Sequence, residues 1–162
     1  MRKIINLSLI SAAVLLLIVI TILVAACNSS AGDSKIADSK DGIHFFTGTL
    51  DEAVALSKKE NKPIFLLAHA SYCSSCEKMI SNIFPLKKVG DVFNKKFINA
   101  QVDIESEEGV KVVKDYEITG TPTLLFLTPD GQVINKTSGY QSQQELLALT
   151  RGMKVEGKPV SE

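Results

Sequence analysis

The sequence predicts an α/β domain in which a central mixed β-sheet carries helices on both faces. Two observations support this fold class. Strand-like apolar runs alternate with amphipathic helical patterns over most of the domain, and two strand-like runs joined by a tight turn follow towards its end. Alternating strands and helices favour parallel pairing, whereas a tight turn joins antiparallel neighbours. The expected order of elements is α-β-α-β-α-β-β-α.

The first helix and the first strand are marked by capping residues, proline and apolar content. Thr49-Leu50-Asp51-Glu52 has the pattern of a capping box, so a helix is expected from there to about Glu60, before Pro63. Residues 63–70 are nearly all apolar. A strand of that composition is expected to be covered on both faces.

The second helix is predicted by apolar side chains at the spacing i, i+3, i+4 and i+7, which places them on one helix face. These side chains are Cys76, Met79, Ile80 and Ile83. Pro85 would kink or end this helix. A shorter helical piece is then expected through Val89, Val92 and Phe93.

The remaining elements are predicted from alternation, turn residues and a second capping box. The predicted ranges are 97–104 for a strand, 107–116 for a helix, 123–128 and 133–137 for two antiparallel strands, and 142–152 for a final helix. Val110 and Val113 are expected on the buried face of the 107–116 helix. Pro129-Asp130-Gly131 is typical of a tight turn. Ser142-Gln143-Gln144-Glu145 has the capping-box pattern.

Cys73-Ser74-Ser75-Cys76, where the first strand meets the second helix, is the most informative motif of the chain. Two sulfurs at this spacing can cycle between dithiol and disulfide. The unpaired N–H groups and the dipole of a helix N-terminus favour a thiolate on the first sulfur. Cys73 is therefore expected to be the exposed nucleophile, and Cys76, one turn further on the buried face, the resolving thiol. Ser74 and Ser75 can tune the pKa of the sulfurs by donating hydrogen bonds, whereas Glu77 opposes thiolate formation.

The N-terminal segment predicts export and attachment to a membrane. Met1-Arg2-Lys3 precedes an almost wholly apolar run, which ends in Val24-Ala25-Ala26 just before Cys27. Residues 1–26 resemble the signal peptide and lipobox of bacterial lipoproteins. The resemblance implies cleavage before Cys27 and a lipid on its sulfur, which would account for the odd one of three cysteines. An uncleaved signal anchor and an ordinary secretory signal are the alternatives, and all three send the domain across the membrane.

Composition divides the rest of the chain into a tether, one domain and a tail. Residues 27–41 hold the lipidated cysteine and a small, polar tether, residues 42–153 supply one domain, and residues 154–162 have the composition of a disordered tail. The chain has 18 basic and 18 acidic residues, and loss of residues 1–26 would remove two basic ones. A net charge of about −2 offers no electrostatic footprint for nucleic acid, so no nucleic-acid partner is expected.

Three features together resemble the thioredoxin superfamily: the order of elements, Tyr72 with the C-x-x-C motif after the first strand, and Gly120-Thr121-Pro122-Thr123 opening the third strand. The resemblance covers residues 45–152 and is greatest to the membrane-tethered thioredoxin-like proteins of the bacterial envelope. It implies a thioredoxin-like fold with a cis peptide bond before Pro122. It also implies substrate contacts by Tyr72, Pro122 and the backbone of Thr121. Otherwise Pro122 would merely begin an edge strand.

The sequence departs from cytosolic thioredoxin around the sulfurs. Leu67 stands where that family has a buried aspartate, and Gln101 stands in place of its lysine partner. The usual proton acceptor for the resolving thiol is therefore absent. Tyr72 replaces a frequent tryptophan, and Ser74-Ser75 replaces Gly-Pro. These changes leave the redox potential and the choice of partner open.

His69, four residues before Cys73, is a second polar candidate near the sulfurs. It can shuttle protons for Cys76, or as a cation lower the pKa of Cys73. Alternatively it is a hydrogen-bonded residue that fills space.

These observations predict a thiol–disulfide oxidoreductase that acts on protein disulfides outside the cytoplasm, more a reductase or interchange protein than an oxidase. Because an isolated dithiol drifts towards oxidation there, a membrane partner is expected to supply electrons. Exchange between sulfurs needs no metal or organic cofactor. The alternatives are a static structural disulfide, an adaptor with a quiescent pair, and a Cu(I) carrier that uses Cys73, Cys76 and His69. The direction of electron flow stays open.

Overall fold

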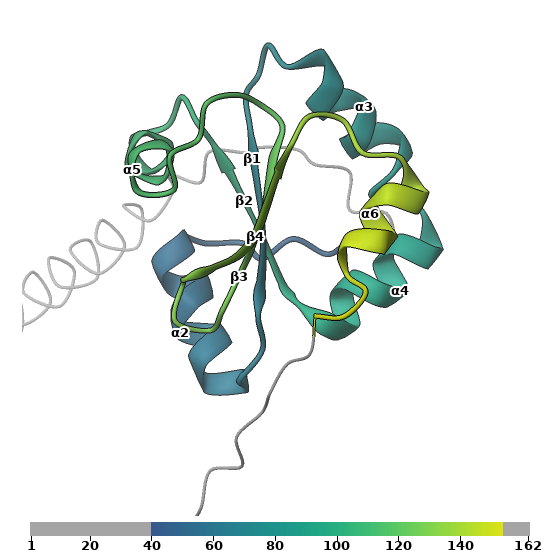
Figure 1. Ribbon diagram of the computed structural model, residues 1–162, viewed down its shortest axis with the longest axis horizontal. Helices are drawn as coiled ribbons and strands as arrows, with labels where there is room; N and C mark the ends of the chain where they lie inside the picture. The colour runs from purple at the N-terminus through teal and green to yellow at the C-terminus, as the bar shows by residue number, and fades with distance from the viewer. Residues whose placement is uncertain (1–39, 154–162) are drawn as a thin grey trace, which may run out of the picture. The chain divides into compact units, whose positions relative to one another are not determined.

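The computed structural model describes residues 40–153, and every helix and strand predicted over this range is present (Figure 1). The helices are α2 (Leu50–Glu60), α3 (Ser74–Asn82), α4 (Lys87–Lys96), α5 (Glu107–Asp115) and α6 (Gln143–Leu149). The strands are β1 (Ile64–His69), β2 (Ile98–Asp103), β3 (Thr123–Leu127) and β4 (Val133–Ser138). Both capping boxes form, at the start of α2 and of α6. The predicted signal peptide, Cys27, nearly all of the tether and the tail 154–162 lie outside the described residues.

The four strands form one mixed sheet in the order β2-β1-β3-β4, as the fold class predicts. β1 pairs with β2 in parallel, and β3 runs antiparallel to both β1 and β4. The parallel pair needs a crossover, which α3 and α4 supply, whereas a short turn joins β3 to β4. Ala68 of β1 pairs with Thr123 of β3. The C-terminal end of β1 therefore lies beside the start of β3.

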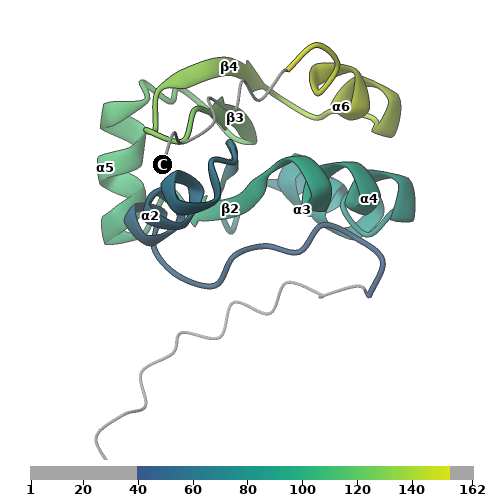
Figure 2. The same cartoon turned by 90° about the horizontal axis from the view of Figure 1, so that it is seen from below.

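Helices cover both faces of the sheet, with α3, α4 and α6 on one face and α2 and α5 on the other (Figures 1 and 2). β1 alternates between two buried clusters, so that Phe65 and Leu67 face one side whereas Leu66 and Ala68 face the other. Its first five residues are fully buried. Burial of each large apolar side chain stabilises the fold by about 1.5–3 kcal/mol. The strand is thus covered on both faces, which confirms the prediction from its composition.

Helix α5 is rotated relative to the prediction. The expectation that Val110 faces the sheet is wrong, because 63% of this residue is exposed. Gly109 instead packs against the end of β2, so closely that a Cβ atom there would lie 2.6 Å from the Cα of Ile104. Val112, three residues after Gly109, is 4% exposed, and Val113 packs partly against the same cluster. The close approach at Gly109 therefore determines which face of α5 meets the sheet.

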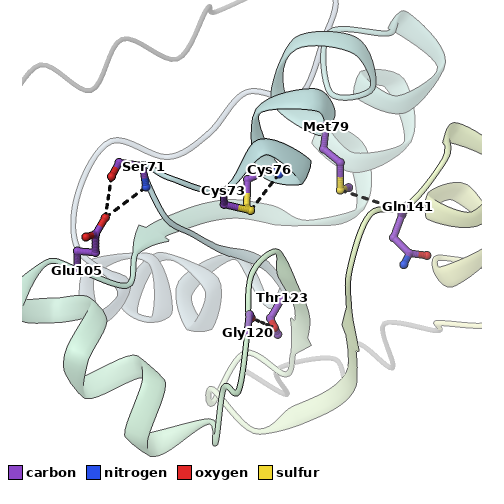
Figure 3. Close-up of a disulfide and its surroundings, with 8 residues drawn as sticks. All are labelled: Ser71, Cys73, Cys76, Met79, Glu105, Gly120, Thr123 and Gln141. Carbon is purple, nitrogen blue, oxygen red and sulfur yellow. Dashed lines mark hydrogen bonds between the residues drawn. A yellow bond between two sulfur atoms is a disulfide. The ribbon is translucent and has the colours of Figure 1, made fainter.

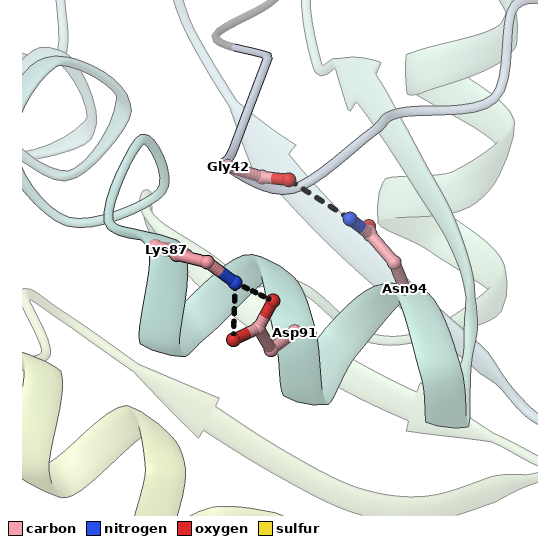
Figure 4. A network of polar contacts seen from close by, with 4 residues as sticks. All are labelled: Gly42, Lys87, Asp91 and Asn94. Atoms are coloured by element: carbon pink, nitrogen blue, oxygen red, sulfur yellow. Dashed lines mark hydrogen bonds and ion pairs between the residues drawn. The ribbon is translucent and has the colours of Figure 1, made fainter.

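The start of the described domain runs along α4. Figure 4 shows the Asn94 side-chain amide donating to the Gly42 carbonyl oxygen at 2.9 Å. The carbonyl oxygen of the same side chain accepts the His44 backbone N–H at 2.9 Å. Nearby on α4, Lys87 and Asp91 form an exposed ion pair one turn apart, with N–O 2.7 Å. One asparagine thus holds both ends of residues 42–44 against the helix.

Candidate active site

The two cysteines of the motif form a disulfide where β1 leads into α3 (Figure 3). The S–S distance is 2.09 Å and the Cα atoms are 5.2 Å apart. β1 ends at His69, and the Cys73 N–H donates to the Ala70 carbonyl oxygen at 3.1 Å to close a turn before the helix. Strand, turn and helix together bring the two sulfurs into contact.

Cys73 is the N-cap of α3, and its Sγ accepts the Cys76 backbone N–H at 3.1 Å. The end of a helix presents N–H groups without intrahelical partners, and its dipole places about half a positive charge there. The position therefore favours negative charge on the Cys73 sulfur, which is the condition for a thiolate nucleophile. Within residues 40–153 the hydrogen bond to Cys73 Sγ comes from a backbone N–H, and neither the Ser74 nor the Ser75 hydroxyl donates a hydrogen bond to it.

Cys73 is more exposed than Cys76, as predicted, but both residues are largely buried. Cys73 is 9% exposed and Cys76 is 1% exposed. Both pack with Ala70 and with the partly buried Ile104. The expectation of an exposed Cys73 is therefore wrong for the disulfide state, because neighbouring apolar side chains cover most of it. Cys76 does lie on the buried face of α3, as expected.

The segment before β3 lies at the same edge of the sheet as the disulfide. The Thr121–Pro122 peptide bond is cis, as the resemblance implies. Thr123 Oγ1 donates to the Gly120 carbonyl oxygen at 2.6 Å and so closes the short segment that contains this bond (Figure 3). Because β3 begins beside the end of β1, this segment borders the approach to the sulfurs. Its role in binding a substrate stays a prediction.

His69 ends β1 and is paired in register with Asp103 of β2. Burial lowers the pKa of His69 below its ordinary value, and the nearby negative charge of Asp103 offsets this only in part. The neutral ring is therefore favoured near neutral pH. This direction weighs against a cationic His69 that lowers the pKa of Cys73, and both that role and proton transfer by His69 stay predictions.

The two positions that differ from cytosolic thioredoxin lie side by side in the sheet. Leu67 of β1 is paired in register with Gln101 of β2, as the comparison of the sequences requires. Leu67 is fully buried. The Gln101 Oε1 atom is buried and makes no hydrogen bond within the described part of the chain. An apolar side chain and an uncharged amide therefore occupy this paired position in the sheet.

Sequence reasoning missed two contacts that hold the surroundings of the disulfide in place (Figure 3). Ser71 Oγ donates to Glu105 Oε2 at 2.8 Å, and the Ser71 N–H points to the same oxygen at 3.4 Å. The Gln141 backbone N–H contacts Met79 Sδ at 3.4 Å and joins α3 to the segment before α6. The partners are 34 and 62 residues apart, so no local pattern indicates either contact.

Within residues 40–153, no three His, Cys, Asp or Glu side chains lie close enough together to hold a metal ion. With Cys73 and Cys76 joined in a disulfide, His69 forms no such group with them. The same residues include no helix that is both long and apolar enough to cross a bilayer.

Known proteins are similar to this chain in sequence and in fold. The thioredoxin-like domain family matches residues 50–154. Thiol:disulfide interchange protein DsbD of Campylobacter jejuni is 30% identical over 115 residues, which are 70% of this chain and 19% of that protein. Spermatogenesis-associated protein 20 of Rattus norvegicus is 34% identical over 87 residues, 50% of this chain and 11% of that protein. The chain thus spans only a small part of the length of these curated relatives.

A solved structure agrees with the family match over nearly its whole length. The solution structure of a proposed disulphide isomerase from Bacteroides thetaiotaomicron superposes with a TM-score of 0.62 at 31% identity. The match covers 72% of this chain and 98% of that one. This protein is therefore a member of the thioredoxin-like domain family, and its Cys73 and Cys76 form a disulfide.

Proposed function

We propose that this protein exchanges thiols and disulfides with protein clients outside the cytoplasm, through Cys73 and Cys76. The observation that carries the proposal is the position of Cys73, whose Sγ caps α3 and accepts a backbone N–H at 3.1 Å. A sulfur in that position is stabilised as the attacking thiolate. The segment before β3, at the same edge of the sheet, supports the proposal, because an extended client peptide can pair there with the Thr121 backbone.

In the reducing direction the exchange proceeds in two steps. The Cys73 thiolate attacks one sulfur of a client disulfide, so that a Cys73–client disulfide forms and the other client sulfur leaves and takes up a proton. Cys76 then loses its proton and attacks the Cys73 sulfur. The Cys73–Cys76 disulfide forms, and the second client sulfur leaves as a thiol. Two electrons pass to the client in each cycle, and no cofactor takes part.

We infer that the pair acts as a reductase or interchange protein rather than as an oxidase. A strongly stabilised thiolate makes a dithiol–disulfide couple oxidising. Glu77 in the first turn of α3 brings negative charge towards the same helix end and so limits that stabilisation. The names of the relatives, an interchange protein and a disulphide isomerase, also support this direction. A membrane partner would then supply electrons, because an isolated dithiol outside the cytoplasm drifts towards oxidation.

We propose that a lipid on Cys27 holds the domain on the extracytoplasmic side of a bacterial membrane. The support is the pattern of residues 1–27, in which a short basic start and a long apolar run precede small residues and a cysteine. Several acyl chains, at about 0.8 kcal/mol for each buried CH₂ group, would hold the protein on the bilayer almost permanently. The polar tether would then allow the domain to reach clients and its electron donor.

Trapping of the mixed disulfide tests the exchange. Cys76→Ser removes the resolving thiol, so this variant should accumulate a dithiothreitol-sensitive adduct with insulin, used as a disulfide-containing client. Cys73→Ser is the matched control, because it keeps one thiol at the buried position and should form no adduct. Adducts of equal yield with both variants, or none with either, would contradict the assigned roles.

The equilibrium potential of the wild-type pair against glutathione decides the direction of electron flow. A potential below that of the glutathione couple supports reduction or interchange. A potential well above it would assign the protein as an oxidase instead.

A further inference from the structure

We propose that Glu105 is a positioning residue that fixes the turn on which Tyr72 and Cys73 are presented to protein clients. This inference rests on the proposed exchange function and adds to it an element that favours proteins over small disulfides. Glu105 comes from the connection between β2 and α5, and it acts through Ser71 (Figure 3).

The turn from Ala70 to Cys73 is a four-residue corner between β1 and α3. Its closing bond runs from the Cys73 N–H to the Ala70 carbonyl oxygen at 3.1 Å, so Ser71 and Tyr72 hold the two central positions. Tyr72 is 71% exposed, and it precedes the N-cap of α3. The direction in which the Tyr72 ring points therefore depends on how firmly its neighbour Ser71 is held.

Ser71 is held by a single carboxylate oxygen. Its Oγ donates to Glu105 Oε2 at 2.8 Å and its backbone N–H points to the same atom at 3.4 Å, a pair of contacts that we call the Ser71–Glu105 clamp. Hydrogen bonds to an ionised acceptor are roughly twice as strong as neutral ones. Both contacts fix the corner of the turn, because one binds its side chain and the other its main chain.

The clamp is itself well anchored. The Glu105 N–H donates to Asp103 Oδ1 at 2.9 Å. The preceding N–H, that of Ile104, donates to the His69 carbonyl oxygen at 2.9 Å, and Ile104 packs against the small cluster that contains both cysteines. Two consecutive residues thus brace the Cys73 loop, with Ile104 packed against the cysteine cluster and Glu105 bonded to the turn before it.

A role in positioning is separable from a role in stability. Ser71 is exposed, and both clamp contacts lie at the surface. Loss of the clamp therefore leaves no buried polar group without a partner, and surface substitutions of that kind change stability little. The clamp restrains one turn, so its removal should affect the binding of clients that contact the turn.

The experiment compares a protein client with a small disulfide. Glu105→Ala and Ser71→Ala each remove the clamp from one side, and Glu107→Ala removes the same charge from the exposed first turn of α5 as the matched control. Insulin reduction driven by dithiothreitol reports on the protein client, and reaction of the pre-reduced protein with dithiodipyridine reports on Cys73 alone. Both clamp variants should raise the KM for insulin about tenfold, with kcat and the dithiodipyridine rate within about twofold of wild type. Glu107→Ala should match wild type, and Glu105→Gln, which keeps an acceptor oxygen, should lie between.

Two results would overturn the positioning role. One is a KM for insulin within about twofold of wild type in either clamp variant. The other is an equal loss towards insulin and dithiodipyridine, because Glu105 would then tune the sulfur and not the turn.

Failure of the proposed function would look different. In that case the wild-type protein reacts with dithiodipyridine but not with insulin, and amide hydrogen exchange then decides the role of the clamp. The Ser71 amide should exchange about tenfold faster in Glu105→Ala than in Glu107→Ala. Equal exchange rates in the two variants would reject the clamp.

Discussion

Replacement of Gly109 by alanine should destabilise the domain, although helix propensity alone predicts the opposite. Gly109 lies in the first turn of α5, and alanine is favoured over glycine in a helix by up to about 1 kcal/mol. A Cβ atom there, however, would collide with the Asp103 carbonyl oxygen and lie 2.6 Å from Ile104 Cα and 2.8 Å from the Asp103 carbonyl carbon. These are backbone atoms at the end of β2, so no side-chain rotation relieves the contact.

The size of the effect follows from these distances. Carbon atoms pack at about 3.5–4.0 Å, so α5 must shift away from β2 by roughly 1 Å. Forcing extra volume into a well-packed interior costs about 1–3 kcal/mol, and a backbone obstacle favours the upper end of that range. The gain in helix propensity offsets part of this packing cost. The free energy of unfolding should therefore fall by about 2 kcal/mol, which is a roughly 30-fold change in the unfolding equilibrium.

Urea unfolding followed by far-UV circular dichroism measures this loss. With a slope of about 1.5 kcal/mol per molar urea, the midpoint should fall by about 1.3 M. Val110→Ala on the exposed face of the same helix is the matched control and should change stability by less than about 0.5 kcal/mol. A midpoint for Gly109→Ala equal to or above that of wild type would refute the reasoning. It would mean that α5 does not pack on β2 with this face.

Other changes probe the core, the pH response and the membrane anchor. Phe65 is fully buried and packs on four aromatic rings, the nearest at 4.8 Å, so urea unfolding should show a loss of about 3–5 kcal/mol for Phe65→Ala and about 1–2 kcal/mol for Phe65→Leu. Unchanged stability in Phe65→Leu would contradict a contribution from the ring contacts. Burial lowers the pKa of His69 from 6.5, so the unfolded chain binds this proton more readily and stability should fall as the pH drops below that value. In His69→Gln the urea midpoint should decrease less between about pH 7 and pH 5 than in wild type. An unchanged decrease would mean that another group causes the loss of stability. Cys27→Ser should move the protein from the detergent phase to the aqueous phase in detergent partitioning, and a variant that stays with detergent would point to an uncleaved anchor.

The order of the elements was predictable because each helix and strand has its own local pattern. The capping box at Thr49 marks the start of α2, and the apolar run over 64–69 marks a strand covered on both faces. The disulfide pair was predictable for the same reason, since Cys73 and Cys76 lie within one turn of α3. Such patterns depend on residues only a few positions apart.

The surroundings of the pair were not predictable in the same way. The buried face of α5 follows from the approach of Gly109 to β2, and Val110, although apolar, points away. Cys73 lies largely covered in a cluster with Ala70 and Cys76, against which Ile104 packs from another segment of the chain. The bond of Ser71 to Glu105 joins residues 34 positions apart, and a serine and a glutamate on their own indicate no partner.

By itself, the sequence determined the α/β class, the succession of helices and strands, and the place of the two sulfurs at the start of α3. These properties arise from side-chain periodicity, capping and the fixed reach of a short stretch of backbone. Only the tertiary structure decided how far Cys73 is covered, that Gln101 has a buried oxygen without a partner among residues 40–153, and which carboxylate holds the Cys73 turn. Those properties arise where segments distant in the chain come into contact, and the packing of the folded domain selects among many pairings that the local pattern leaves equally open.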